Sequence, residues 1–374
     1  MTAFGEMNLM KLARAEIFPI HVPYRRTVKW HSDVETGGDY VVLKLTDADG
    51  HIGAAEATTK AYWSGASLRT LVAALEDLFL PRFMDVDVGD IEAVVARLAR
   101  VPDNTIAKGL IASACLDLQA DVADEPLWKQ WDGAPRVPLS WTVSRQAPDL
   151  MAAEAAEMVA AHGFRALKIK GGQGPEIDYQ VIRAIQRAAG DKLELYVDTN
   201  QAYDLAVSRD YVKGLADLGV VMAEDPYPLK PDEAFRDFAA ASPIPILVDT
   251  PVISARDAQA FFDVGAVAVS VKPGRIGLAE ARRCVAAAKK AGRYIVAGFF
   301  GESDLGSAVN AQLAASCASD GLKLPAELSF FLMMRESLLA PSLSVAHGVL
   351  QLPDTPSVAA SVDWARLEKV RVSI

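Results

Sequence analysis

Residues 166–170 read Ala-Leu-Lys-Ile-Lys, a short apolar run that carries two lysines. Successive side chains of a β-strand point to opposite faces, so Lys168 and Lys170 lie on one face of the predicted strand and Ile169 on the other. Apolar residues three and four positions apart follow at 179–189 and predict an amphipathic helix. This strand-then-helix unit recurs along most of the chain and indicates its fold class.

Eight strands of this kind are predicted, and they cover residues 137–143, 166–170, 193–200, 220–225, 244–249, 266–272, 294–298 and 322–328. Helical spacing recurs between them, as at 254–264 and 278–291. Nearly continuous apolar strands that alternate with helices indicate a parallel sheet with helices on its outer face. Eight such units predict an α/β barrel of the TIM type over residues 136–345, with an open doubly wound sheet as the alternative.

The first 135 residues lack this rhythm and predict a separate α+β domain over residues 1–135. Its expected strands and helices cover residues 12–21, 40–47, 67–78 and 106–121. Two further segments, 23–38 and 57–65, are predicted to be loops, and they hold aromatic and cationic residues that include Arg25 and Tyr62. Such loops are candidate ligand contacts, although aromatic side chains packed against their own domain are an equally good explanation.

The composition excludes several classes of protein. The 374 residues include 38 Lys and Arg against 48 Asp and Glu, a net charge of −10, and the basic residues are scattered, which argues against a nucleic-acid surface. The three cysteines are far apart and predict neither a disulfide framework nor a thiolate metal site. Because no secretory signal and no run of about 18 apolar residues is present, we expect a cytoplasmic protein without a membrane partner.

Charged residues stand at the ends of five consecutive predicted strands. Their order is Lys170, Asp198, Glu224, Asp249 and Lys272, at successive spacings of 28, 26, 25 and 23 residues. One such carboxylate alone is readily explained as the N-cap of the next helix. Five in a row arrive at the same end of a barrel, which is the end where barrel enzymes carry their chemistry.

These strand-end residues predict a metal site flanked by two bases. Three crowded carboxylates, Asp198, Glu224 and Asp249, repel each other unless a cation lies among them, and hard oxygen ligands favour Mg²⁺ or Mn²⁺. The five histidines show no zinc-binding spacing. Lys170 and Lys272 come from opposite sides of the carboxylates, so one base could face each side of a substrate that loses its α-proton to give an enolate.

Taken together, the motifs resemble the enolase superfamily, in its muconate-lactonizing (muconate cycloisomerase) and mandelate racemase-like group. The resemblance covers nearly the whole chain and rests on residues 53–59, 139–142, 168–170, 198–201, 224–226, 249, 272, 298–306 and 325–328. It implies a TIM-type (β/α)7β barrel, an N-terminal capping domain whose loops 23–38 and 57–65 close over the substrate, and a C-terminal segment, 346–374, that returns to the capping domain. We also expect a homo-oligomer.

The resemblance implies a role for each matching residue. The acid/base catalysts would be Lys170 and Lys272, while Lys168 supports a metal-bound carboxylate and Glu327 hydrogen-bonds the enolate oxygens. The implied ligands of Mg²⁺, with Mn²⁺ as an alternative, are Asp198, Glu224 and Asp249. The expected contacts of a small carboxylate substrate are Arg25, Tyr62, Asn200 and Glu302.

The motifs differ in the particular reaction they favour. Residues 325–328 favour the muconate cycloisomerases, whereas residues 272–277 look more like N-acylamino-acid racemases and o-succinylbenzoate synthases. Cycloisomerisation of a muconate-like diacid is the leading interpretation. The alternatives are a racemase or epimerase of N-acylamino acids or dipeptides, and an o-succinylbenzoate synthase-type dehydratase. Because Thr250 stands where relatives usually have Glu, and Asp225 where Gln is usual, a catalytically silent binding protein is a third interpretation.

Overall fold

A curled parallel sheet of seven strands forms the centre of the molecule. The computed structural model describes residues 9–30, 34–84, 86–317 and 324–374. The strands are all parallel and lie in the order β11-β10-β9-β8-β7-β6-β5. Their bounds are β5 (Trp141–Val143), β6 (Ala166–Lys170), β7 (Glu194–Asp198), β8 (Met222–Glu224), β9 (Ile246–Val248), β10 (Ala268–Val271) and β11 (Tyr294–Ala297).

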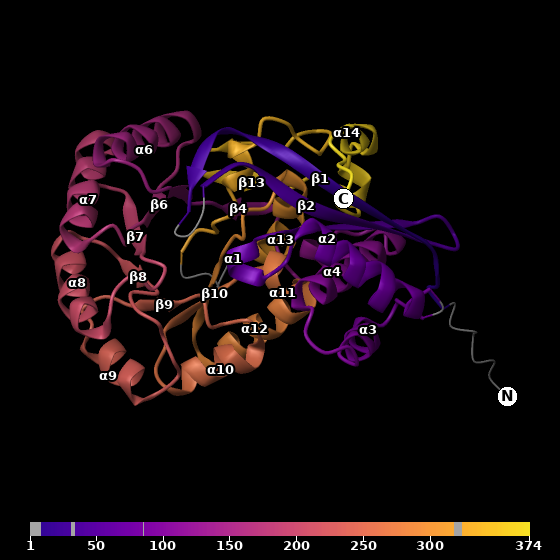
Figure 1. The fold of residues 1–374 in the computed structure, drawn as a ribbon, viewed down its shortest axis with the longest axis horizontal. Helices are drawn as coiled ribbons and strands as arrows, with labels where there is room; N and C mark the ends of the chain where they lie inside the picture. Colours follow the sequence, from indigo (N-terminus) through magenta and orange to yellow (C-terminus); the bar gives the residue numbers. More distant parts are fainter. Residues whose placement is uncertain (1–8, 31–33, 85, 318–323) are drawn as a thin grey trace.

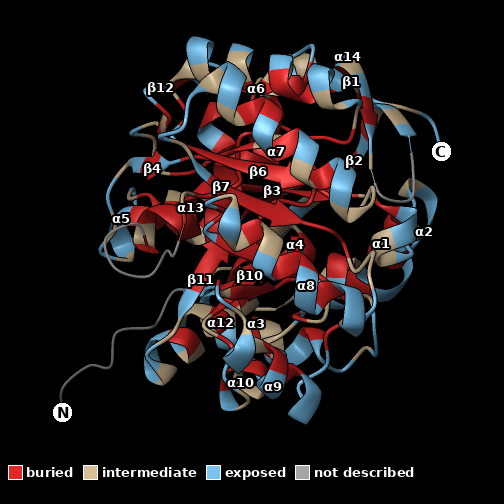
Figure 2. Cartoon of the chain, turned by 90° about the vertical axis from the view of Figure 1, so that its left-hand side faces the viewer, coloured by how far each residue is buried: buried red, intermediate tan, exposed pale blue. Residues whose placement is uncertain are grey.

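Helices cover the outer face of this sheet, as the alternating pattern predicts (Figure 1). Their bounds are α6 (Pro148–His162), α7 (Pro175–Ala189), α8 (Leu205–Asp217), α9 (Glu233–Ala241), α10 (Ala255–Asp263), α11 (Pro273–Ile276) and α12 (Leu278–Ala291). In α7, Val181, Ile182 and Ile185 face inward and are buried, which is the apolar stripe of an amphipathic helix. The buried strands and half-exposed helices are distinct in Figure 2.

The eighth predicted strand, 322–328, is much shorter in the structure. Residues 322 and 323 lie outside the described part, and only Ala326 makes a parallel bridge, to Leu139. Ala326 N donates to Pro138 O at 2.8 Å, and Glu327 N donates to Ala297 O at 2.8 Å. The segment therefore lies between the chain that enters β5 and the end of β11. Pro325 has no N–H, which limits the ladder that this segment can form.

The first predicted strand of the sheet, 137–143, is also wrong in its extent, because the chain changes partners within it. Residues Arg136–Pro138 form β4, which pairs antiparallel with β13 (Val349–Gln351), and β13 pairs with β12 (Val345–Ala346). Only Trp141–Val143 joins the parallel sheet as β5.

The N-terminal part is a capping domain built on a three-stranded antiparallel sheet, β1 (Leu12–Lys29), β2 (Val34–Asp47) and β3 (Ile52–Thr58). The segment predicted to be a loop at 23–38 is mostly a continuation of the β1–β2 hairpin, with an irregularity between Pro23 and Val28. Alternating burial of Tyr24 and Val28 explains the extended conformation. Residues 31–33 of that loop lie outside the described part. The second predicted loop, 57–65, ends β3 and then forms the short helix α1 (Ala61–Ser64).

The remaining helices pack around these sheets. They are α2 (Leu68–Ala73), the π-helical turn η1 (Ala74–Phe79), the 3₁₀ turn η2 (Leu80–Arg82), α3 (Ile91–Leu98), α4 (Thr105–Val122), α5 (Leu127–Gln130), α13 (Asp304–Cys317), the 3₁₀ turns η3 (Phe330–Met333) and η4 (Ala359–Ser361), and α14 (Trp364–Lys369). The chain end returns to β1, where His21 N donates to Val370 O at 3.1 Å and Val372 N donates to Pro19 O at 2.9 Å. In the described part of the chain, no helix has both the length and the apolar character to cross a membrane.

Candidate active site

The five predicted charged residues do meet at one end of the parallel sheet. In the strand register, Lys170 pairs with Asp198, and Asp198 pairs with Glu224. Asp249 and Lys272 follow directly after β9 and β10. The three carboxylates are fully buried, and the two lysines are 8% and 6% exposed. The period of the strand-and-helix unit is therefore what brings these residues together.

Lys168 lies at the centre of this cluster and has no exposed surface. Its Nζ is 2.7 Å from Glu224 Oε2, 3.2 Å from Asp198 Oδ2 and 3.0 Å from Glu327 Oε2. Burial alone lowers the pKa of Lys168, but Glu224, Glu327 and Asp198 outweigh it and raise that pKa well above its usual value. Lys168 is therefore a fixed positive charge rather than a base. Tyr196 supports it by donating from its hydroxyl to Glu327 Oε1 at 3.0 Å.

Lys170 has the opposite electrostatic character. Its Nζ donates to Asp198 Oδ2 at 2.5 Å and lies 3.5 Å from Asn200 Oδ1. Burial lowers the pKa of Lys170, and although Asp198 opposes this, the positive charge of Lys168 adds to it, so the net shift is downward. Asn200 also fixes Asp198, because its backbone N donates to Asp198 Oδ1 at 2.8 Å. A lysine with a lowered pKa is suited to accept a proton.

Lys272 occupies the matching position on the other side of the carboxylates. Its Nζ donates to Asp249 Oδ2. Arg275 on α11 donates from Nη2 to the backbone O of Asp249 at 3.2 Å, and so holds the turn after β9. Burial would raise the pKa of Asp249, but Lys272 and Arg275 together keep it below its usual value. Asp249 is therefore an ionised carboxylate inside the protein.

The expected metal-ligand set is not assembled in these side-chain positions. Among the described residues, no group of three or more His, Cys, Asp or Glu side chains is placed to hold a metal ion. The carboxylates on adjacent strands repel each other, and lysine ammonium groups neutralise them one by one. Even so, Asp249 Oδ1 and Glu224 Oε2 are buried and accept no hydrogen bond from described residues, although Lys168 Nζ is near the latter. Burial and the neighbouring Asp198 raise the pKa of Glu224 well above its usual value, and a cation among these oxygens would favour the ionised form. Buried carboxylate oxygens of this kind fit a hard divalent cation.

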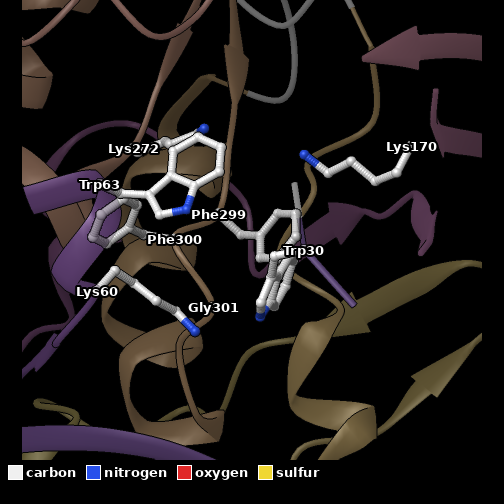
Figure 3. A pocket seen from close by; sticks show the side chains of 8 residues that line it. All are labelled: Trp30, Lys60, Trp63, Lys170, Lys272, Phe299, Phe300 and Gly301. Carbon is white, nitrogen blue, oxygen red and sulfur yellow. The ribbon is translucent and has the colours of Figure 1, made fainter. Parts of the chain in front are cut away.

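A pocket opens beside the two lysines (Figure 3). It is lined by Trp30, Lys60, Trp63, Lys170, Lys272, Phe299, Phe300 and Gly301. The aromatic wall is continuous, since the ring centroids of Trp30 and Phe299 are 6.2 Å apart and those of Phe299 and Phe330 are 5.5 Å apart. The capping domain and the strand ends therefore enclose the pocket jointly.

The predicted substrate contacts are distributed unevenly around this pocket. Asn200 lies next to Lys170, as expected. Glu302 is buried beside the lining residue Phe300, where it accepts from Phe300 N at 2.7 Å and from Asn310 Nδ2 at 2.9 Å. Arg25 lines a different cavity, because its Nε donates to Met334 O at 3.0 Å. Tyr62 is 71% exposed on α1. None of the four predicted substrate contacts is among the residues that line the pocket.

Six lining residues were not among the predicted site residues, namely Trp30, Lys60, Trp63, Phe299, Phe300 and Gly301. Trp30 and Lys60 belong to the two capping segments that the sequence marks as ligand contacts. Phe299 and Phe300 directly follow the seventh strand of the sheet, β11. Their place at a strand end is the signal that could have identified them.

The two unusual residues near the buried carboxylates, Asp225 and Thr250, have a structural connection. Asp225 accepts from Asp249 N at 3.0 Å through Oδ1 and from Thr250 N at 2.8 Å through Oδ2. Burial and the neighbouring Asp249 raise the pKa of Asp225 to about 6. Asp225 therefore fixes the backbone of the turn on which Asp249 lies.

Comparison with known proteins gives consistent relatives. The family model described as "Enolase C-terminal domain-like" matches residues 150–366. Muconate cycloisomerase 1 from Rhodococcus opacus is 26% identical over 365 residues, covering 96% of this chain and 97% of that protein. An o-succinylbenzoate synthase from Geobacillus stearothermophilus is 28% identical over 342 residues, covering 88% of each. A solved muconate lactonizing enzyme from "Mucobacterium Smegmatis", complexed with muconolactone, superposes with a TM-score of 0.91 at 26% identity and covers 97% of this chain and 100% of that one.

Proposed function

We propose, on the premise that the chain belongs to the Enolase C-terminal domain-like family, that it is an isomerase or lyase that moves a proton at the carbon next to a carboxylate. Cycloisomerisation of a muconate-like diacid is the leading reaction. The observation that carries this proposal is that Lys170 and Lys272 line one pocket while each contacts a different buried carboxylate.

One of the two lysines carries the proton in the cycloisomerase reaction. In the lactone-forming direction, a carboxylate oxygen of the substrate adds to a double bond, and one lysine ammonium gives its proton to the α-carbon. In the reverse direction the same lysine, as a neutral amine, takes that proton back. The lowered pKa of Lys170 makes its neutral amine easier to reach than that of an exposed lysine, which suits it to take up the proton.

The buried cluster around Lys168 serves the charge that develops on the substrate carboxylate. Lys168 stays positive, and its contact with Glu327, at 3.0 Å, fixes the carboxyl group that we propose to hydrogen-bond the enolate oxygens. Tyr196 and Ser140 support this arrangement, with 2.9 Å between their hydroxyl oxygens. Because these groups are buried and already oriented, they need no rearrangement during the reaction.

We propose Asp198, Glu224 and Asp249 as the ligands of a divalent cation, Mg²⁺ or alternatively Mn²⁺. When bound, this ion supplies positive charge beside the substrate carboxylate and so favours removal of the α-proton. Lys170 and Lys272 then exchange their contacts with Asp198 and Asp249 for contacts with substrate.

Racemisation or epimerisation is the second candidate reaction, and the presence of both lysines in one pocket favours it specifically. A two-base reaction needs one group on each face of the α-carbon. The substrates would be N-acylamino acids or dipeptides, and an o-succinylbenzoate synthase-type dehydration would use the same first step. A catalytically silent binding protein would need the same pocket but no titrating lysine.

A substrate panel with matched lysine variants tests the proposal. Muconates, N-acylamino acids, dipeptides and o-succinylbenzoate precursors are incubated with Mg²⁺ in ²H₂O, and product and deuterium at the α-carbon are measured. We expect turnover of one class, abolished in Lys170→Ala. Racemisation is supported if Lys272→Ala stops exchange from one enantiomer only, and cycloisomerisation if lactone forms. Absence of both turnover and exchange would leave only the binding protein.

Five further properties complete the proposal. The domains are residues 1–135, 136–345 and 346–374, the last returning to the capping domain. The segment 325–328 is the eighth strand of a closed (β/α)7β barrel, supported by its bonds to Pro138 and Ala297. The protein is a homo-oligomer of the cytoplasm, and small carboxylates rather than nucleic acids or membranes are its partners.

A further inference from the structure

Lys60 and Glu35 form an ion pair at the wall of the pocket that the proton transfer does not use. Lys60 Nζ donates to Glu35 Oε2 and lies 4.9 Å from the ring centroid of Trp30. Trp30 Nε1 donates to the same Glu35 Oε2 at 2.6 Å, and the Tyr24 hydroxyl lies 3.4 Å from it. Three donors on the capping domain therefore converge on one carboxylate oxygen.

This group of donors faces the same pocket as the two lysines of the proposed proton transfer. Lys60, Lys170 and Lys272 all line it. In Figure 3, the Lys60 ammonium lies on one side of the aromatic side chains, and those of Lys170 and Lys272 lie on the other. Gly301 leaves room for Lys60, because a Cβ at Gly301 would lie 3.1 Å from Lys60 Cε. The pocket thus has positive charge at both ends.

We propose that Lys60 and Trp30 bind the distal carboxylate of a flat dicarboxylate substrate, and that Glu35 holds this position until the substrate replaces it. The inference rests on the proposed function, which directs the reacting carboxylate toward Lys170 and Lys272. The aromatic rings of Trp30 and Phe299, with centroids 6.2 Å apart, offer flat apolar surface for the carbon chain between the two carboxylates.

The exposure of the ion pair supports an exchange of this kind. The Lys60 side chain is 8% exposed and that of Glu35 is 19% exposed. Glu35 is closer to water and can turn toward it, whereas Lys60 remains enclosed and needs a counter-ion. A second carboxylate provides that counter-ion, so Lys60 is paired both before and after binding. A monocarboxylate cannot provide it and leaves Glu35 in place.

Binding of a non-reacting diacid tests this directly. Adipate and its monomethyl ester, in which a neutral methyl ester replaces one of the two carboxylates, are titrated calorimetrically into the full-length protein with Mg²⁺. The variants are Lys60→Met, Glu35→Gln and the charge-balanced double variant, which keeps a folded protein available if Lys60→Met alone is unstable. Lys44→Met is the matched control, because Lys44 Nζ also lies over a tryptophan, 4.6 Å from the Trp364 centroid, and pairs with Glu16 at 3.5 Å.

We expect the wild type and Lys44→Met to bind adipate at least about tenfold more tightly than the ester, as a charge-assisted contact gives. Lys60→Met and the double variant should bind the two ligands within about twofold, since the group that distinguishes them is gone. Glu35→Gln should bind adipate several-fold more tightly than wild type does, because the competing carboxylate has lost its charge. Its affinity for the ester should equal that of wild type. A retained preference for adipate in Lys60→Met, or weaker adipate binding in Glu35→Gln, would overturn the proposal.

The outcomes separate this inference from the proposed function. Equal binding of the two ligands by the wild type overturns the role of Lys60 even if muconate is converted. The protein could instead prefer adipate over the ester through Lys60 and yet turn over no member of the substrate panel. That result supports the dicarboxylate site and contradicts the proton-transfer reaction.

Discussion

Lys168 Nζ lies 3.0 Å from Glu327 Oε2, and this contact joins β6 to the segment that runs between the two edge strands of the parallel sheet. Both residues are buried. The same ammonium group also lies 2.7 Å from Glu224 Oε2, so one positive charge compensates carboxylates from two distant parts of the chain. The charged cluster therefore contributes to the stability of the sheet as well as to its chemistry.

Replacing Lys168 with Met should lower the free energy of unfolding by about 3–5 kcal/mol, because Glu224 and Glu327 would remain buried without the positive charge that compensates them. Urea unfolding followed by circular dichroism measures the loss. Lys213→Met is the control, since its ion pair with Asp210, at 3.0 Å, joins side chains that are 63% and 87% exposed. That variant should change stability by less than about 1 kcal/mol. Equal stability of the two variants would show that the buried charge needs no compensation.

Lys170→Met and Lys272→Met should each reduce kcat by about 10²–10⁴-fold, the usual contribution of a positioned acid or base. Stopped-flow or steady-state rates on whichever panel substrate turns over measure this. Lys289→Met, on the outer helix α12, is the control and should retain activity. A residual rate near that of wild type in both pocket variants would exclude proton transfer by these lysines.

The pH dependence should identify Lys170 as the group with the lowered pKa. A base must be neutral, so kcat/KM for proton removal should rise with pH and level off at a pKa below the usual 10.5 of lysine. Lys170→Arg keeps the charge at all pH values and should remove this rising limb together with most of the rate. The profile is measured from pH 6 to about 10. An unchanged rising limb in Lys170→Arg would assign it to another group.

Mg²⁺ should bind one site per chain and raise the melting temperature, because a ligand that binds only the folded state stabilises it. Glu224→Gln should weaken this binding by about tenfold or more, since the amide lacks the charge that a hard cation needs. Glu56→Gln is the matched control, as Glu56 is also a buried carboxylate but binds Ser303. Calorimetric titration of protein first treated with chelator tests this. Undiminished binding in Glu224→Gln would place the ion elsewhere.

The sequence predicts most of the strands because the regular repeat makes their ends coincide. Lys170, Asp198 and Glu224 lie in neighbouring register positions for this reason. The extent of the first and last strands was not predictable in the same way. Both depend on pairing across the sheet, where Ala326 N donates to Pro138 O and Ser140 N donates to Ala326 O, between segments almost 190 residues apart.

The capping side of the site was harder to predict because its residues act through tertiary contacts. Composition marked 23–38 as a ligand-binding loop, yet Arg25 points to another cavity and Trp30 reaches the pocket. On a twisted hairpin, residues a few positions apart face different sides, and the irregularity after Pro23 shifts that alternation. Sequence periodicity alone does not locate such a shift.

Asp225→Asn should change how stability depends on pH. The pKa of Asp225 is raised from 3.8 to about 6, so between these values the folded protein keeps a proton that the unfolded chain has lost. The stability from this group is thus fully present below about pH 4 and is lost as the pH rises through about 6, by roughly 1–3 kcal/mol. Asn does not titrate. The difference in free energy of unfolding between wild type and Asp225→Asn should therefore become smaller from pH 4 to pH 7.

Urea unfolding at both pH values gives that comparison. Asp204→Asn is the control, because Asp204 is an exposed N-cap of α8 and Asn caps equally well. If the difference in free energy of unfolding between wild type and Asp225→Asn is the same at both pH values, the Asp225 carboxyl group titrates alike in the folded and unfolded states.

Gly109→Ala should loosen the contact between the capping domain and the turn that carries Lys272. A Cβ on Gly109 of α4 would lie 2.7 Å from Gly277 N and 2.9 Å from the carbonyl carbon of Ile276, and these backbone atoms cannot rotate away. The cost of overpacking, about 1–3 kcal/mol, should exceed the roughly 1 kcal/mol that Ala gains in a helix. In Gly214→Ala, the control, the new Cβ meets only the end of the Tyr179 side chain, so stability should fall less or rise. Because α11 follows Lys272 directly, kcat/KM should fall in Gly109→Ala alone, whereas equal effects in both variants would contradict the close backbone contact.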